Sequence, residues 1–360
     1  MRVVIIGGGM AGRRLAELLP PDDVTVLGDE PSYNRGRLTE YVAGRAEVAR
    51  GNEPSAVAVA VDRRRQVVTD AEGRQYAYDR LVFATGAVPV VPEGVGPAAG
   101  IRTLRSADDA EAIVAEAAQV RRAVVLGGGV LGVETACALR ERGVAVTLVH
   151  DGETLLDTTV RPSAGRRVTR AVRRLGAEVL LNAELAGTDT KDGRFRRLRL
   201  RNGSEVYGEL LVVACGVRAR TELADGLTVR GGIVVDGTLT SPDDPRVHAL
   251  GDCAEIEGRL TGTVESAWTQ AEALAKHLTG EAAQLPDYEV VRVTAGGLDL
   301  LVLGDKDEDG EVVRLEDDAR YVRAVLRDGV VRSAVAVGAP DVAAELVLLR
   351  SEERRVGKRV

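Results

Sequence analysis

The chain opens with a pattern of apolar and glycine positions that recurs once further along. RVVIIGGGMAGRRLAELL begins at residue 2, and AVVLGGGVLGVETACALRERG begins at residue 123. In both, an apolar run suited to a buried strand leads through a glycine-rich turn into apolar positions three and four residues apart. A second apolar run follows each copy, VTVLGDE and VTLVH. The pattern therefore predicts two strand-helix-strand units.

Between and after these units the chain alternates shorter elements. Alternating positions near 56–83 predict an antiparallel meander before the strand LVFATG, and the Pro- and Gly-rich run VPVVPEGVGPAAG predicts a linker. A helix is expected near 107–119. In RFRRLRLRNG, Leu198 and Leu200 share one strand face, and we interpret the opposite arginine face as solvated rather than as a binding patch.

Strand signals after Ala224, in GIVVDG and VHALGDCAE, lead to a helix that contains Trp268 and Gln270. From about residue 286, short strands such as DLLVLG and RYVRAVLRDG predict a third, small α+β domain. The last ten residues are charged and are expected to fray.

Both glycine turns are in G-x-G-x-x-G register, with Gly7, Gly9 and Gly12 in the first copy and Gly127, Gly129 and Gly132 in the second. This spacing between strand and helix suits a dinucleotide pyrophosphate, because glycines permit the tight turn and the close approach of backbone to phosphate. The alternative is a pair of ordinary tight turns. Two copies in the same setting favour two bound nucleotides and electron transfer between them.

The second strand of each unit normally ends in a group that meets the adenosine ribose. Asp29 and Glu30 stand there in the first unit, and His150 with Asp151 in the second. Carboxylates fit a ribose hydroxyl and repel a 2′-phosphate, and no arginine cluster lies at the second site, so NADH is favoured over NADPH. Alternatively, His150 is a solvent-facing residue at a strand end.

Composition narrows the function classes. A length of 360 residues indicates two or three domains, and a net charge of −7 argues against nucleic-acid binding. No apolar stretch reaches the roughly 20 residues of a membrane span, so a cytoplasmic protein without a membrane partner is expected. The cysteines, Cys137, Cys215 and Cys253, are too few and scattered for a disulfide framework or a metal site.

Five motifs now point to one family. In order they are GGGMAG, the loop EPSYNRGRLTEYVAGR, ATGAVP, GGGVLGVE, and GVRARTELA followed by VHALGDCAE. Over roughly residues 1 to 340 the chain resembles the FAD-dependent pyridine nucleotide-disulfide oxidoreductases. Within that family it is most similar to the branch of ferredoxin and rubredoxin reductases and of the N-terminal flavin module of nitrite reductase large subunits.

The resemblance implies an α/β fold of two Rossmann-like dinucleotide-binding domains plus the C-terminal α+β domain. The FAD domain is expected to be discontinuous, with the NAD domain inserted into it. The expected ranges are 1–104 and 225–285 for FAD, 105–224 for NAD(P)H, 286–345 for the C-terminal domain and 346–360 for a charged tail.

Roles also follow from the resemblance. Asp252 is expected to accept a hydrogen bond from the FAD ribitol, Arg35 to lie over the flavin or its pyrophosphate, and Glu134 to lie near the nicotinamide. The helix starting near Trp268 is expected to aim its N-terminal amides at the flavin. The expected FAD set is Gly7, Gly9, Met10, Ala11, Gly12, Asp29, Glu30, Arg35, Thr85, Gly86, Asp252 and Trp268. The expected NAD(P)H set is Gly127, Gly129, Val130, Leu131, Gly132, Glu134, His150 and Gly216.

Two departures from the family pattern shape the expected chemistry. The loop after the first glycine turn has no redox-active cysteine, and we interpret all three cysteines as buried packing residues. The lysine that relatives often carry at the end of that loop is also missing, since the chain reads Leu38-Thr39-Glu40 there. Cysteine catalysis is therefore not expected, and the tuning of the flavin is expected to differ.

The expected function is hydride transfer from NADH to FAD, followed by electron transfer to a small iron-sulfur or rubredoxin-type protein. Arg35, Arg37, Arg45 and the strand arginines are a hypothetical docking patch for such an acceptor. One alternative is direct reduction of a small molecule or dioxygen. Another is a redox-silent FAD-binding scaffold. The oligomeric state stays open.

Overall fold

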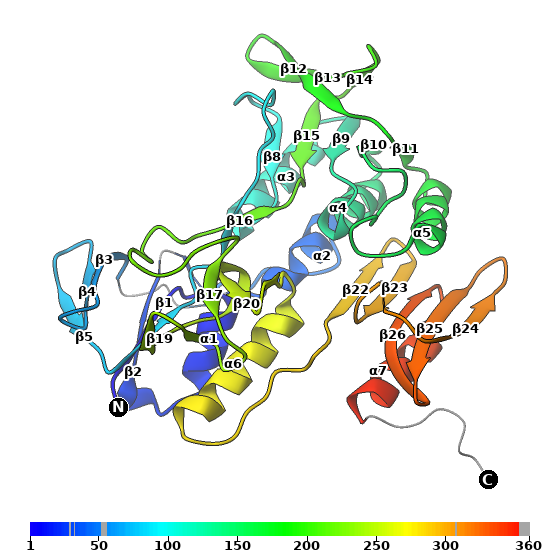
Figure 1. The fold of residues 1–360 in the computed structure, drawn as a ribbon. Helices are drawn as coiled ribbons and strands as arrows, with labels where there is room; N and C mark the ends of the chain where they lie inside the picture. The colour runs from blue at the N-terminus through cyan, green and yellow to red at the C-terminus, as the bar shows by residue number, and fades with distance from the viewer. Residues whose placement is uncertain (29, 32, 52–55, 307, 353–360) are drawn as a thin grey trace. The chain divides into compact units, whose positions relative to one another are not determined.

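The computed structural model describes residues 1–28, 30–31, 33–51, 56–306 and 308–352 (Figure 1). The chain forms two compact units. The first unit combines Met1–Gly36, Val48–Val88 and Val217–Pro286, and the second combines Arg37–Glu47, Pro89–Gly216 and the described residues from Asp287 onward. The first unit is therefore discontinuous in sequence. The segments β7 (Ala87–Pro89) and β16 (Val217–Ala219) pair where the chain leaves the first unit and returns to it.

The first unit is built on a five-stranded sheet in the order β18-β19-β6-β1-β2. The strands are β1 (Val3–Ile6), β2 (Val24–Leu27), β6 (Arg80–Phe83), β18 (Thr240–Ser241) and β19 (Asp244–Ala249). Strand β1 is buried throughout and pairs in parallel with β2 and β6, as its uninterrupted apolar run predicts. Two helices, α1 (Met10–Leu18) and α6 (Val264–Leu278), pack against each other in this unit.

Smaller elements complete the first unit. The predicted meander is confirmed as an antiparallel sheet of β3 (Ala58–Asp62), β4 (Val67–Asp70) and β5 (Gln75–Ala77). A further sheet contains β17 (Ile233–Val235), β20 (Ala254–Ile256) and β21 (Arg259–Leu260). Short 3₁₀ turns are η1 (Pro21–Asp23), η2 (Arg35–Arg37) and η3 (Gly251–Cys253).

The second unit repeats the architecture with a parallel sheet in the order β11-β10-β9-β15-β8. Its strands are β8 (Ile101–Thr103), β9 (Arg122–Leu126), β10 (Ala145–Val149), β11 (Glu178–Leu180) and β15 (Leu210–Val213). The helices are α2 (Leu38–Ala43), α3 (Ala107–Ala117), α4 (Val130–Glu141) and α5 (Pro162–Arg174). Helix α3 begins at a capping box in which Ser106 and Asp109 bond each other's backbone amides.

An antiparallel sheet of β12 (Leu185–Lys191), β13 (Arg194–Leu200) and β14 (Glu205–Tyr207) extends this unit. Leu198 and Leu200 are buried as predicted. The run 88–100 is not a free linker, because Gly94 accepts a hydrogen bond from the Thr188 amide and Ala99 accepts one from the Phe195 amide. Proline and glycine content alone did not reveal this docking.

The C-terminal part of the second unit is an antiparallel sheet with one helix, which confirms the predicted α+β character. The sheet order is β22-β23-β26-β25-β24, with β22 (Val290–Ala295), β23 (Leu298–Leu303), β24 (Glu311–Glu316), β25 (Tyr321–Arg327) and β26 (Val330–Val337). Helix α7 (Pro340–Ser351) packs on β26 and β23. Residues 346–351 therefore belong to a helix, and the expectation that the tail starts at 346 is wrong. Among the described helices, none combines the length and apolarity needed to cross a bilayer.

Candidate functional sites at two glycine turns

The first glycine turn joins β1 to α1 in the first unit. Gly7 has a φ of +119°, and a Cβ there would overlap the carbonyl oxygen of Ala84. A Cβ at Gly12 would overlap the carbonyl oxygen of Gly7, so helix α1 starts as close to the turn as two backbones can approach. By contrast, a Cβ at Gly9 would meet nothing within 4 Å.

The second turn, between β9 and α4, has the same construction. Gly127 has a φ of +112°, and a Cβ there would overlap the carbonyl oxygen of Ala214. A Cβ at Gly132 would overlap the carbonyl oxygen of Gly127, whereas Gly129 again faces open space. The two turns thus share tight packing at the first and third glycines and an open middle position.

Both helix N-termini suit a phosphate group. Gly9 and Gly129 are the N-caps of α1 and α4, neither supplies a side-chain cap, and neither helix has an acidic residue in its first turn. The first amides of each helix therefore face the open space with the positive end of the helix dipole. Met10 and Ala11 form the first turn of α1, and Val130 and Leu131 that of α4.

The strand end beside the first turn carries a paired carboxylate. Glu30 accepts hydrogen bonds from Arg35 and from the Tyr33 hydroxyl, the latter at 2.8 Å. Arg35 also lies over the Tyr33 ring, 5.6 Å from its centroid. The loop that carries Arg35 is thereby bonded to the expected ribose-binding position. Asp29 lies outside the described residues.

The strand end beside the second turn carries a buried imidazole. His150 is 8% exposed, so the solvent-facing alternative is wrong. The Gly128 amide donates a hydrogen bond of 3.3 Å to His150 Nδ1, and His150 Nε2 lies 3.3 Å from an Asp157 carboxylate oxygen. Asp151 is within 3.1 Å of Nδ1. The histidine therefore closes one side of the second turn with two carboxylates beside it.

Asp252 lies in η3, directly after β19. A Cβ at the preceding residue, Gly251, would lie 3.1 Å from the Ala11 Cβ, so the aspartate turn is held against the first turn of α1. Gln270, 2% exposed, accepts a hydrogen bond of 2.6 Å from the Gly251 amide and donates one of 2.8 Å to Thr261. Sequence reasoning placed Gln270 on a helix without a role, because no local signal links residues 19 positions apart.

The other expected site residues lie at ordered backbone crossings. Thr85 donates a hydrogen bond of 2.5 Å to the carbonyl oxygen of Arg220, and Gly86 accepts one from the Arg220 amide at 2.9 Å. In the second unit, Gly216 has a φ of +92° and accepts a hydrogen bond from the Val90 amide. These bonds hold the two crossing segments in place.

Glu134 is bonded to the loop whose lysine is missing. The Thr39 hydroxyl donates a hydrogen bond of 3.3 Å to Glu134 Oε2, which joins α2 to α4 within the second unit. Glu40 instead pairs with Arg37 at 3.0 Å. A neutral hydroxyl contact thus occupies the place where relatives were expected to have a lysine.

Helix α6 begins at Val264, where the N-cap Thr263 accepts a hydrogen bond from the Ser266 amide. Trp268 consequently lies in the second turn, and our expectation that the helix starts near it is wrong. Its side chain is 40% exposed. The N-terminal amides of α6 belong to residues 264–266.

The cysteines are poorly suited to thiolate chemistry. Burial raises the pKa of Cys137 to about 12, that of Cys215 to about 11, and also that of Cys253. Cys137 and Cys253 are buried as predicted, whereas Cys215 is only partly buried. None of the three thiols has the lowered pKa of a reactive cysteine.

The arginines proposed as a docking patch each have an acidic neighbour. Arg35 pairs with Glu30, Arg37 with Glu40 and Arg45 with Glu141. The strand arginines pair likewise, Arg197 and Arg199 with Asp189 and Arg201 with Glu184. These pairs neutralise much of the positive charge that the sequence suggested.

Two glycine turns of this geometry define a protein of the dinucleotide-binding oxidoreductase class. The profile of the pyridine nucleotide-disulphide oxidoreductase family matches residues 1–273, and the chain belongs to that family. Membership confirms the predicted family, fold and enzyme class, that of FAD- and NAD(P)H-dependent oxidoreductases.

Relatives include the nitrite reductase [NAD(P)H] of Bacillus subtilis (strain 168), 30% identical over 94% of this chain and 45% of that protein. The nitric oxide reductase FlRd-NAD(+) reductase of Vibrio vulnificus (strain CMCP6) is 31% identical over 79% of this chain and 80% of its own length. This chain thus spans less than half of the first relative. Among solved structures, the reductase in a covalent putidaredoxin reductase-putidaredoxin complex has a TM-score of 0.88 at 23% identity, covering 97% of this chain and 93% of that one.

Proposed function

We propose that this protein is an FAD-dependent reductase that oxidises NADH and delivers electrons to a small iron-sulfur or rubredoxin-type protein. The observation that carries the proposal is the pair of glycine turns with open helix N-termini, one in each unit. The Vibrio relative, a nitric oxide reductase FlRd-NAD(+) reductase, supports the acceptor class. The bound nucleotides supply the redox chemistry, and the chain supplies alignment and electrostatics.

We assign FAD to the first turn and NADH to the second, with domain boundaries that follow the two units rather than the ranges expected from the sequence. In the first unit, Gly9, Met10 and Ala11 offer amides to the pyrophosphate, and Asp252, held by Gln270 through Gly251, accepts a hydrogen bond from the ribitol. Glu30, held by Tyr33 and Arg35, meets the adenosine ribose.

In the second unit, Gly129, Val130 and Leu131 have the corresponding role for NADH. The carboxylates of Asp151 and Asp157 beside His150 disfavour a 2′-phosphate, and residues 146–160 contain no arginine or lysine that would attract one. Glu134, oriented by Thr39, positions the nicotinamide amide. We place the reaction in the cytoplasm, where NADH is available.

Cysteine chemistry is not part of this proposal, since the three pKa values are raised by burial. The direct reduction of a small molecule or dioxygen and a redox-silent scaffold are the competing functions. Each competing function predicts a result that differs from that of the proposed function in the experiment described next.

The test is anaerobic stopped-flow mixing of FAD-loaded protein with NADH or NADPH, followed at about 450 nm, where oxidised flavin absorbs. Rapid bleaching by NADH, and reoxidation that accelerates with added rubredoxin or ferredoxin, is the expected result. Fast reoxidation when dioxygen is added to the reduced protein, at a rate that those proteins do not change, supports the small-molecule alternative. Tight FAD binding without bleaching by either coenzyme supports the scaffold.

A matched variant tests the coenzyme assignment. Asp151→Arg replaces a largely exposed carboxylate with a cation beside His150 and is expected to shift preference toward NADPH about tenfold, as a charge exchange near a phosphate does. Asp192→Arg, on the tight turn between β12 and β13, makes the same charge change away from the glycine turn and serves as control. Equal behaviour of both variants would contradict the placement of the adenosine ribose.

A further inference from the structure

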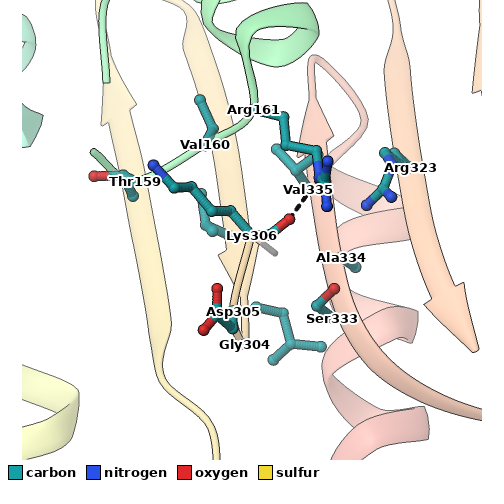
Figure 2. A pocket seen from close by; sticks show the side chains of 12 residues that line it. Thr159, Val160, Arg161, Gly304, Asp305, Lys306, Arg323, Ser333, Ala334 and Val335 are labelled. Atoms are coloured by element: carbon teal, nitrogen blue, oxygen red, sulfur yellow. Dashed lines mark hydrogen bonds between the residues drawn. The ribbon is translucent and has the colours of Figure 1, made fainter. Parts of the chain in front are cut away.

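The second unit contains a pocket that the proposed redox reaction does not use (Figure 2). It lies between the C-terminal sheet and the segment that leads into α5. Residues 159–161 line one side, residues 302–306 at the end of β23 line another, and Arg323 of β25 and Ser333 of β26 close it.

Positive charge dominates the polar lining. Arg161, Lys306 and Arg323 contribute three cations, against the single carboxylate of Asp305. Figure 2 shows the guanidinium groups of Arg161 and Arg323 directed into the same part of the pocket. Burial, and then the charge of Arg161, lower the pKa of Arg323, which indicates that the two cations affect each other.

Arg323 is in an unusual position for a charged side chain. Its neighbours along β25, Val322 and Ala324, and the residues two positions away, Tyr321 and Val325, are all buried. Among the described residues, Arg323 has no hydrogen bond and no ion pair. A partly buried cation normally has an anionic partner, because removing it from water without one is costly.

Ser333 adds a neutral donor at the same place. It is 3% exposed, its hydroxyl has no hydrogen-bond partner in the described part of the chain, and Figure 2 shows it beside the pocket. The Ser333 hydroxyl and the Arg323 guanidinium lie on neighbouring strands and line the same pocket, so both can donate to one acceptor placed there.

The remaining cations are held in place by the backbone. Arg161 Nε donates a hydrogen bond of 2.7 Å to the Lys306 carbonyl oxygen, and Lys306 Nζ donates one of 2.7 Å to the Asp157 carbonyl oxygen. Arg161 is also the N-cap of α5, whose dipole adds positive potential. These bonds reduce the conformational entropy lost when a ligand binds.

We propose that this pocket is a binding site for a small oxyanion, either free phosphate or the phosphate group of a small metabolite, with Arg323 and Ser333 as its principal ligands. Tetrahedral oxyanions accept several hydrogen bonds at once, which suits a guanidinium and a hydroxyl that converge. The proposal is independent of the redox function.

The experiment is isothermal titration of the full chain, saturated with FAD and NAD⁺ so that both glycine turns are occupied, with inorganic phosphate and separately with glycerol phosphate at constant ionic strength. Thermal unfolding in the same solutions gives a second readout, because a ligand that binds only the folded state raises Tm. We expect saturable binding and a rise in Tm. Tighter binding of glycerol phosphate indicates a metabolite site, and equal or tighter binding of phosphate indicates a free-ion site.

Arg323→Met and Ser333→Ala test the ligands. Arg323→Met is expected to weaken binding at least about tenfold, the typical effect of losing a charged hydrogen bond, without lowering Tm in the absence of anion. Ser333→Ala is expected to weaken it a few fold. Arg314→Gln is the matched control, because Arg314 lies opposite Arg323 on β24 but does not line the pocket.

Retained binding in Arg323→Met, or equal loss in Arg314→Gln, would overturn the site. A lower Tm for Arg323→Met without anion would also contradict it, since that result assigns the arginine a structural role. Absence of any saturable binding of either anion to the unmodified chain overturns the proposal outright.

Discussion

The two glycine turns have nearly the same backbone, but the second glycine of the GGG run has different surroundings in each turn. A Cβ at Gly8 would have its nearest neighbours at 3.9 Å, whereas a Cβ at Gly128 would lie 2.5 Å from the His150 ring. The same glycine is thus required in the second turn but not in the first. At Gly8 the motif tolerates a side chain, and at Gly128 a tertiary neighbour forbids one.

The next difference lies two residues after the third glycine. In the first unit this position is Arg14, which pairs with Glu272 of α6 at 2.6 Å and so joins two helices. In the second unit it is Glu134, bonded to Thr39 of α2. Equivalent positions in a repeated motif therefore serve packing in one unit and the proposed coenzyme site in the other.

The largest effect is expected at the last glycine of each G-x-G-x-x-G motif. Gly12→Ala and Gly132→Ala each place a methyl group against a backbone carbonyl that cannot move away, and should destabilise their unit by more than about 3 kcal/mol. Calorimetric unfolding is the measurement. If either variant melts like the unmodified protein, the close approach of helix and turn is wrong.

The open glycines provide the control for that experiment. Gly9→Ala and Gly129→Ala meet no atom within 4 Å and should leave Tm nearly unchanged. Each methyl group would instead occupy the proposed pyrophosphate space, so Gly9→Ala should weaken FAD binding and Gly129→Ala NADH binding. A reversed pattern would exchange the two cofactor assignments.

Acid should weaken the first unit through His248 of β19. Burial, and then the nearby charge of His277, lower its pKa from 6.5 to about 4. Between these values the unfolded chain binds a proton that the folded chain does not, so stability falls as pH decreases from 6.5 to 4, by up to about 3 kcal/mol. Unfolding curves over this range test it. His248→Asn, which keeps a partner for Thr240, should flatten the dependence.

A smaller difference in stability is expected between substitutions at Gly8 and at Gly128, the second glycine of each GGG run. Gly128→Ala forces the His150 ring to move and should cost about 1–3 kcal/mol, whereas Gly8→Ala should cost much less. Thermal unfolding of the two variants is the comparison. Adding His150→Ser to Gly128→Ala should recover part of the loss, and additive losses in the double variant would show that the ring is not the obstacle.

The smallest effect is expected at the hydroxyl contact of Glu134. Thr39→Val removes a long hydrogen bond and should slow flavin reduction by NADH a few fold, in line with about 1 kcal/mol. Thr39→Ser should retain the rate. Arg14→Gln, at the equivalent position of the first unit, should lower stability slightly and leave the rate unchanged. If Arg14→Gln slows flavin reduction and Thr39→Val does not, the roles assigned to the two equivalent positions are wrong.

Much of the fold was predictable because its signals are local. The buried parallel strands, the meander near 56–83 and the C-terminal α+β domain follow from apolar runs, alternation and glycine positions. The docking of the 88–100 run was not predictable. Its hydrogen bonds to Thr188 and Phe195 join residues about a hundred positions apart.

The site divides in the same way. The two glycine turns, the acidic strand end of the first unit and the absence of a cysteine pair were all predictable, because each depends only on residue type and short spacing. Packing between distant segments buries His150 against Gly128, bonds Thr39 to Glu134 and places Gln270 at the turn before Asp252. It also leaves Arg323 without a hydrogen bond or ion pair among the described residues. These contacts depend on which distant side chains the packing of strands and helices brings within hydrogen-bond distance. Neither composition nor periodicity determines how close two such side chains lie in space.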